Sequence, residues 1–121
     1  MDNNIGKWLI DILNCINEID SFFEGNEKKY DEYCKNILLK RGIERNLEII
    51  GEAVNRILNK KPDIEIVNAR QIVQFRNLVI HSYDNISDSN VWAVIINHLP
   101  KLKIEVQKLI DINFPNFPNF I

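Results

Sequence analysis

Residues 37–59 read ILLKRGIERNLEIIGEAVNRILN, and this stretch decides the fold class. Its apolar side chains recur at helical intervals, at Leu38, Ile43, Leu47, Ile50, Val54 and Ile57. This spacing places them on one face of an amphipathic α-helix, which must bury that face against other elements. Gly51 interrupts the pattern, where it costs about 1 kcal/mol relative to alanine unless close packing requires it. We therefore expect Gly51 to mark a helix crossing.

The segments on both sides repeat the helical spacing. We predict further helices over residues 5–23, 29–36, 64–81 and 89–110, with breaks at 24–26, 60–63 and 84–88. Ser87 or Asp88 can cap the last helix, and Pro100 should kink it because proline removes a backbone donor. Leu78 and Val79 should face the core. No useful length of chain alternates as a strand does, so the sequence predicts an all-α antiparallel bundle of about four to five helices.

The composition is typical of one folded domain. The chain has 121 residues, of which 45% are hydrophobic and 26% charged. We expect a helical-bundle domain over residues 1–112 and a Phe/Pro/Asn-rich tail over residues 113–121. The phenylalanines of the tail could pack on a partner protein or a sister protomer, or the tail could be a frayed end. The formal net charge of −2 argues against a protein that coats nucleic acid by bulk positive charge.

The cysteines and the apolar runs indicate a reduced, cytoplasmic protein. Cys15 and Cys34 are too few for a disulfide framework, and no Cys/His cluster suggests zinc. The N-terminal segment lacks the apolar core of a signal peptide. The longest apolar run, at residues 91–96, is far shorter than the roughly 18 residues that a membrane helix needs. We expect no metal and no cofactor.

Residues 75–84, FRNLVIHSYD, contain the side chains best suited to chemistry. At helical pitch, Arg76, Asn77, His81 and Tyr83 lie along one polar edge where a helix ends. Histidine moves protons near neutral pH, and arginine holds a phosphate with its bidentate fork. These groups can cleave RNA without a metal when a base deprotonates the ribose 2′-hydroxyl and an acid protonates the leaving 5′-oxygen. One such histidine per chain favours a dimer that brings two copies into one cleft.

The spacing alone leaves a plainer interpretation open. An arginine and a histidine at a helix end are more often a surface ion pair and a capping side chain. A second charged set lies at helical spacing, at Arg41, Arg45, Glu48 and Glu52. These residues form either a solvated helix face with internal ion pairs, or part of the cleft. In the second case Arg45 or Glu52 lies beside the cleft and contacts RNA or His81. His98 is predicted to be a surface residue.

Four segments in order carry a family resemblance. Residues 76–83 have the form R-x4-H-x-Y, residues 46–53 read NLEIIGEA, Val91-Trp92 follows the acidic turn, and residues 99–102 read LPKL. Together they resemble the HepT-like HEPN-domain ribonuclease toxins over about residues 5–109. The chain differs from the family at Ser82, since glycine is common there before the tyrosine.

The resemblance implies an all-α HEPN-type dimer whose R-x4-H motifs face a shared cleft. It implies a metal-independent endoribonuclease, the toxin of a type VII-like toxin–antitoxin system, with Arg76 and His81 catalytic and Asn77 orienting His81 or binding phosphate. The implied partner is an MntA-like nucleotidyltransferase antitoxin that adds AMP to Tyr83. Two alternatives remain open: a non-catalytic protein that presents substrate to a minimal nucleotidyltransferase, and a structural dimer with a degenerate site.

Overall fold

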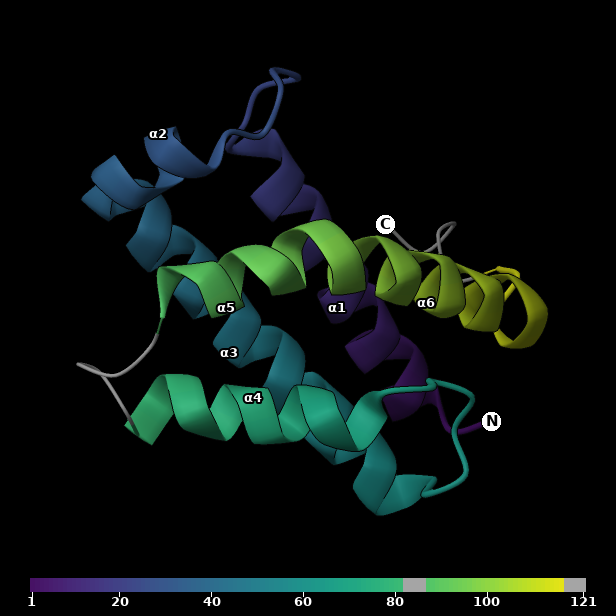
Figure 1. Ribbon diagram of the computed structural model, residues 1–121. Helices are drawn as coiled ribbons and strands as arrows, with labels where there is room; N and C mark the ends of the chain where they lie inside the picture. The colour runs from purple at the N-terminus through teal and green to yellow at the C-terminus, as the bar shows by residue number, and fades with distance from the viewer. Residues whose placement is uncertain (82–86, 117–121) are drawn as a thin grey trace.

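Every regular element of the described chain is a helix (Figure 1). The computed structural model describes residues 1–81 and 87–116, and for residues 80 and 81 it describes the backbone only. The elements are α1 (Asn3–Ser21), α2 (Tyr30–Lys35), α3 (Ile37–Lys60), α4 (Ala69–His81), α5 (Asp88–Ala93), the π-helical η1 (Val94–His98) and α6 (Leu99–Asn113). The predicted all-α helical bundle is confirmed.

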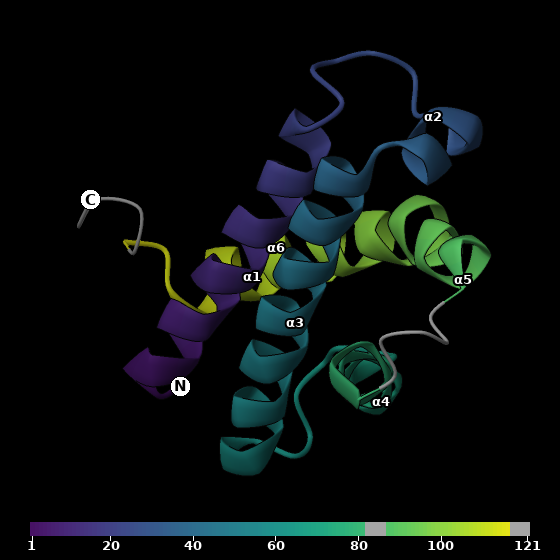
Figure 2. The same ribbon diagram turned by 90° about the vertical axis from the view of Figure 1, so that its left-hand side faces the viewer.

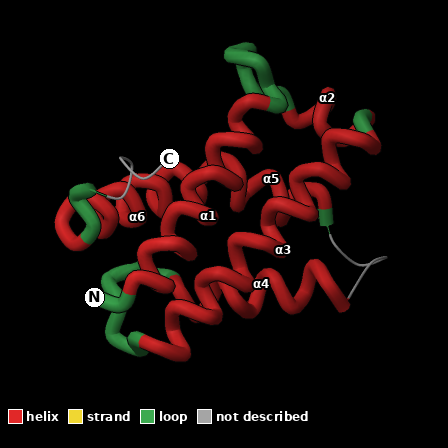
Figure 3. Tube along the Cα trace, turned by 180° about the vertical axis from the view of Figure 1, so that it is seen from behind, coloured by secondary structure: helices red, strands yellow, loops and turns green. Residues whose placement is uncertain are grey.

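The antiparallel helices α1 and α3 form the centre of the molecule, and they lie side by side when seen from either side (Figures 2 and 3). The helix α4 packs across α3, and α6 packs against α1 (Figure 1). The core between them is rich in isoleucine, and its fully buried members include Leu9, Ile12, Ile43, Ile50, Ile57 and Val106. Burying each such side chain contributes about 1.5–3 kcal/mol. The apolar face predicted over residues 37–59 is buried here from Ile43 to Ile57, whereas Leu38 is 80% exposed and the prediction for it was wrong.

The helix ends follow local side-chain chemistry. Glu24 and Gly25 have φ angles of 50° and 73°, so the break predicted after the first helix uses the left-handed region that glycine favours. The Asn36 side chain accepts a hydrogen bond from the Leu39 N–H at 3.0 Å and caps α3. Ser87 accepts one from the Asn90 N–H at 3.4 Å, which confirms the predicted cap of α5.

The helix predicted over residues 64–81 begins later than expected, at Ala69. After Pro62 the chain forms a turn in which the Ile64 N–H donates to the Lys61 carbonyl at 3.1 Å. Ile64 and Ile66 are only 7% and 4% exposed, yet they stand two residues apart and reach the core from this loop. Apolar residues at that interval were therefore mistaken for a helical face.

The break at Pro100 takes the form of a π-helical turn between α5 and α6. The Leu99 N–H donates to the Val94 carbonyl, five residues back, and the chain then resumes α-helical geometry. Pro100 falls in the first turn of α6, where a missing backbone donor costs little. The disruption predicted from Pro100 is present, in the turn that precedes it.

The described part of the tail belongs to the bundle. Phe114 is 6% exposed and joins the hydrophobic core. Phe117 and Phe120 lie outside the described residues, so the docking of the tail stays a prediction. Cys15 is buried and Cys34 half-buried, both as free thiols, and burial raises the pKa of Cys15 to about 11. Within residues 1–81 and 87–116, no helix has the length and apolarity needed to cross a membrane.

Candidate active site

The last two turns of α4 carry most of the predicted site. Arg76 is half-buried and Asn77 exposed, and His81 is the final residue of the helix. Tyr83 lies outside the described residues. Val79 is 3% exposed and faces the core as predicted, but Leu78 is 42% exposed and the prediction for it was wrong. Adjacent helical residues differ by about 100° in direction, so both cannot face the core equally.

Gly51 of α3 lies directly beneath Arg76. A Cβ atom placed on Gly51 would overlap the Arg76 Cβ, stand 2.5 Å from its Cγ and lie 3.5 Å from its Cα. Only glycine allows α4 to cross α3 this closely. The predicted helix crossing at Gly51 is therefore confirmed, and the residue that crosses it is the candidate catalytic arginine.

The side chain of Arg76 is positioned by two contacts, one at its stem and one at its guanidinium. Its stem rests on Gly51, and its Nη1 donates a hydrogen bond to the Asn77 Oδ1 at 2.8 Å. Its Nε is buried and has no hydrogen-bond partner in the described part of the chain. Asn77 thus bonds to Arg76 in this structure. The remaining guanidinium donors are suited to an oxyanion, since an arginine carries five N–H groups in a planar fork.

The second charged set behaves mainly as a solvated face. Glu52 accepts a hydrogen bond from the Arg56 Nη2 at 2.7 Å, and about half of each side chain is exposed. Such an exposed pair contributes only a few tenths of a kcal/mol. Arg45 is exposed and forms no ion pair with any described residue. No cluster of three or more His, Cys, Asp or Glu side chains suited to a metal ion occurs among the described residues.

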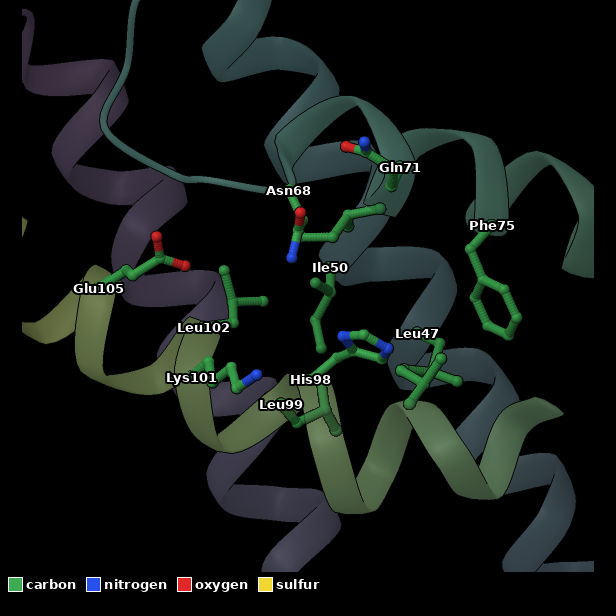
Figure 4. Close-up of a pocket in the computed structure, with 12 residues that line it drawn as sticks. Leu47, Ile50, Asn68, Gln71, Phe75, His98, Leu99, Lys101, Leu102 and Glu105 are labelled. Atoms are coloured by element: carbon green, nitrogen blue, oxygen red, sulfur yellow. The ribbon is translucent and has the colours of Figure 1, made fainter. Parts of the chain in front are cut away.

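A cavity of about 340 Å³ lies between α3, α4 and the η1–α6 segment (Figure 4). Two residues that line it, Ile50 and Phe75, directly precede Gly51 and Arg76 of the crossing in the sequence. Its apolar wall comes from α3, α4, η1 and α6, with Leu47, Ile50, Ile72, Phe75, Val94, Leu99 and Leu102. Its polar rim consists of Asn68, Gln71, His98, Lys101 and Glu105. Sequence reasoning identified His98 only as a surface residue. His98 is exposed as predicted, but it also lies at the end of the π turn and lines this cavity. The helix break predicted at Pro100 was the feature of the sequence that could have indicated a special position for His98.

Comparison with known proteins gives the family. A family model described as ribonuclease HepT-like matches residues 12–109, which is most of the chain. The chain belongs to the ribonuclease HepT-like family. The matched range contains Arg76, Asn77, His81 and Tyr83. A search of solved structures finds no match.

Curated relatives of this HepT-like chain carry ribonuclease names. "Putative RNase MJ1380" of Methanocaldococcus jannaschii is 31% identical over 105 residues, which cover 86% of this chain and 94% of the relative. "Putative RNase MJ1216" of the same organism is 32% identical over 111 residues, which cover 88% of each chain. "Putative RNase TTE0752" of Caldanaerobacter subterraneus is 28% identical over 68% of this chain and 74% of its own. Family and relatives thus support a ribonuclease.

Proposed function

We propose that this HepT-like protein is a metal-independent endoribonuclease in which Arg76 and His81 act on the scissile phosphate. The observation that carries the proposal is the placement of Arg76. Its stem is fixed on Gly51 and its Nη1 donates a hydrogen bond to Asn77. Arg76 stands five residues before His81 on the same helix. A preorganised cation stabilises developing negative charge without reorganisation during the reaction.

The proposed reaction is a transesterification that releases the downstream RNA fragment with a 5′-hydroxyl end. One His81 takes the proton from the ribose 2′-hydroxyl, whose oxygen attacks phosphorus. The bond to the 5′-oxygen breaks, and a second His81 supplies the proton that this oxygen needs. One product fragment ends in a 2′,3′-cyclic phosphate and the other begins with a 5′-hydroxyl. Arg76 stabilises the charged phosphorane that forms before the bond to the 5′-oxygen breaks.

The test is cleavage of RNA by purified protein in EDTA. We expect His81→Ala to lower the rate by about 10²–10⁴-fold and Arg76→Ala by about 10²–10³-fold. Arg70→Ala is the matched control, because Arg70 is an exposed arginine on the same helix and lines a different surface with Asn55 and Pro62. Wild-type rates in both site variants would remove these residues from the mechanism.

A dimer would supply the second histidine. The exposed Leu78 lies on α4 between Arg76 and His81, and an apolar side chain at that place supports an interface beside the motif. We expect Leu78→Asp to give a monomer in light scattering and to lose cleavage. Leu38→Asp, at an 80% exposed leucine at the start of α3, serves as the control. A dimeric, active Leu78→Asp protein would contradict this part of the proposal.

We further propose that the protein is a toxin silenced by a nucleotidyltransferase antitoxin that adds AMP to Tyr83. The tyrosine stands two residues after His81 in the sequence. An adenylyl group there would add bulk and negative charge where an RNA phosphate must bind. Intact mass after treatment with the antitoxin and ATP should show one AMP, absent in Tyr83→Phe. The control is Tyr30→Phe, at a 39% exposed tyrosine, and an AMP retained in Tyr83→Phe would place the modification elsewhere.

A further inference from the structure

The cavity beside the Arg76 crossing has the dimensions and lining of a small-ligand site. Its volume of about 340 Å³ lies within the roughly 300–1,000 Å³ typical of such sites. Its wall is aliphatic apart from the half-buried ring of Phe75. Figure 4 shows the His98 imidazole among the wall residues, with Asn68 and Gln71 on the α4 side and Lys101 and Glu105 on the α6 side.

The polar rim is largely uncommitted. Within the described chain, the side chains of Asn68, Gln71, His98 and Lys101 form no hydrogen bond or ion pair. Glu105 differs, because its Oε2 accepts a hydrogen bond from the Val67 N–H at 2.8 Å. The rim therefore offers the side-chain amides of Asn68 and Gln71, each of which can donate and accept hydrogen bonds, and the imidazole of His98. It also offers the ammonium group of Lys101, since the nearby Glu105 carboxylate already accepts a hydrogen bond from Val67.

The cavity and the seat of Arg76 occupy neighbouring positions on both helices. On α4, Phe75 lines the cavity and the next residue is Arg76. On α3, Ile50 lines the cavity and the next residue is Gly51, on which Arg76 rests. Arg76 and Gly51 do not themselves line the cavity, but consecutive Cα atoms are about 3.8 Å apart, so the cavity lies within reach of a nucleotide next to a phosphate bound by Arg76.

We infer that this cavity receives a nucleobase of the RNA strand that the site cleaves, an inference that rests on the proposed ribonuclease function. A base has π faces for the rings of Phe75 and His98, and polar edges for the amides of Asn68 and Gln71. Lys101 adds positive charge for the backbone of the same nucleotide. The cavity would make cleavage depend on the base beside the scissile phosphate.

The test compares cleavage sites in a random-sequence RNA pool. We expect the wild-type protein to prefer one base at a fixed position from the cut. Gln71→Ala and His98→Ala should weaken that preference and raise KM about tenfold, which corresponds to the loss of about 1.4 kcal/mol of binding. Gln74→Ala is the matched control, because Gln74 is an exposed glutamine on the same helix that lines a different surface. Unchanged preference and KM in both variants, with Arg76→Ala inactive, would overturn the inference and leave the ribonuclease proposal standing.

A direct binding measurement separates the two proposals if the wild-type protein does not cleave RNA. Amide spectra of the labelled protein would be titrated with each of the four ribonucleoside 5′-monophosphates. Saturable shifts at Phe75 and His98 that are lost in Gln71→Ala would support the base site. Absence of shifts with all four would overturn it. A change in oligomer mass in His98→Ala would also overturn it, because it would identify a second copy of the chain as the occupant.

Discussion

At the scale of single residues, Gly51 and Arg76 form one packing unit with two consequences. The absence of a side chain on Gly51 lets α4 approach α3, and the approach fixes the stem of Arg76. Fold stability and the position of the candidate catalytic cation therefore depend on the same contact.

Gly51→Ala tests this dependence. The added methyl group would overlap Arg76, so we expect a loss of about 1–3 kcal/mol of unfolding free energy, together with reduced RNA cleavage. Denaturant unfolding and a cleavage assay measure the two effects.

The control for this variant is Gly42→Ala on the same helix. There a new Cβ meets only the ring carbons of Phe22, at 3.2 and 3.3 Å, and this ring is 37% exposed and can shift. We expect a change within about 1 kcal/mol, since alanine also raises helix propensity. Equal losses in both variants would show that the Arg76 contact is not special.

Glu44 provides a pH-dependent prediction. Burial raises the pKa of Glu44 above its usual 4.5, and Asp88 and Glu48 add to the increase while Arg41 and Lys40 oppose it. The folded state thus favours the protonated acid. The stabilisation that Glu44 contributes is fully present below pH 4.5. It is lost as the pH rises through the higher pKa that Glu44 has in the folded state.

Glu44→Gln should remove this part of the pH dependence. We expect the variant to be at least as stable as the wild type at neutral pH, and its advantage to shrink as the pH falls toward 4.5. Urea midpoints across that interval measure the difference, and Glu65→Gln at an exposed position controls for the loss of one charge. A variant less stable at neutral pH than at acidic pH, relative to wild type, would contradict the assignment.

At the scale of elements, the π turn of η1 determines the effect of Pro100 on stability. A proline inside a continuous α-helix costs about 3 kcal/mol, because it loses a hydrogen bond and clashes with the preceding turn. Here Pro100 stands in the first turn of α6, after the Leu99 N–H has bonded to the Val94 carbonyl.

We therefore expect Pro100→Ala to change the unfolding free energy by less than about 1 kcal/mol. Thermal or urea unfolding measures it, with the shape of the circular dichroism spectrum as a check on helix content. A gain near 3 kcal/mol would mean that the proline strains the helix and that the π turn does not accommodate it.

Periodicity predicts the long elements but misses features set by contacts distant in the sequence. The spacing over residues 37–59 matches α3 because one face of that helix is buried from Ile43 to Leu58, although its first turn is exposed at Leu38. The helical spacing predicted over residues 64–81 includes Ile66, but Ile66 lies in a loop whose Val67 N–H bonds to Glu105, 38 residues away. Phe75 and His98 line the same cavity although they are far apart in the sequence, and no local spacing predicts that they come together.

The candidate site divides in the same way. The motif predicted that Arg76, Asn77 and His81 lie together near the end of one helix, and all three lie on α4. The bond between Arg76 and Asn77 and the seat on Gly51 depend on how α4 crosses α3, which a motif does not encode.

At the scale of the whole molecule, the hydrophobic core extends past the last helix to Phe114. A chain that ends at Asn113 loses this 6% exposed ring, and we expect a loss of about 3–5 kcal/mol. A chain that ends at Asn116 retains every described contact of Phe114 and serves as the control. Denaturant unfolding compares the two. Equal stability of both truncations would show that Phe114 does not contribute to the core, and binding of the second to an antitoxin would test the rest of the tail.

The crossing of α4 over Gly51 also constrains which substitutions at positions 51 and 76 the fold can accept during evolution. A Cβ on residue 51 would overlap the Cβ of residue 76, and every residue except glycine carries a Cβ, so loss of the arginine alone does not make room for a side chain at position 51. Inactive copies that carry another side chain at position 76 should therefore keep glycine at position 51. Glycine at position 51 would then outlast the arginine at position 76, because the close crossing of α4 over α3 requires it whether or not the protein cleaves RNA.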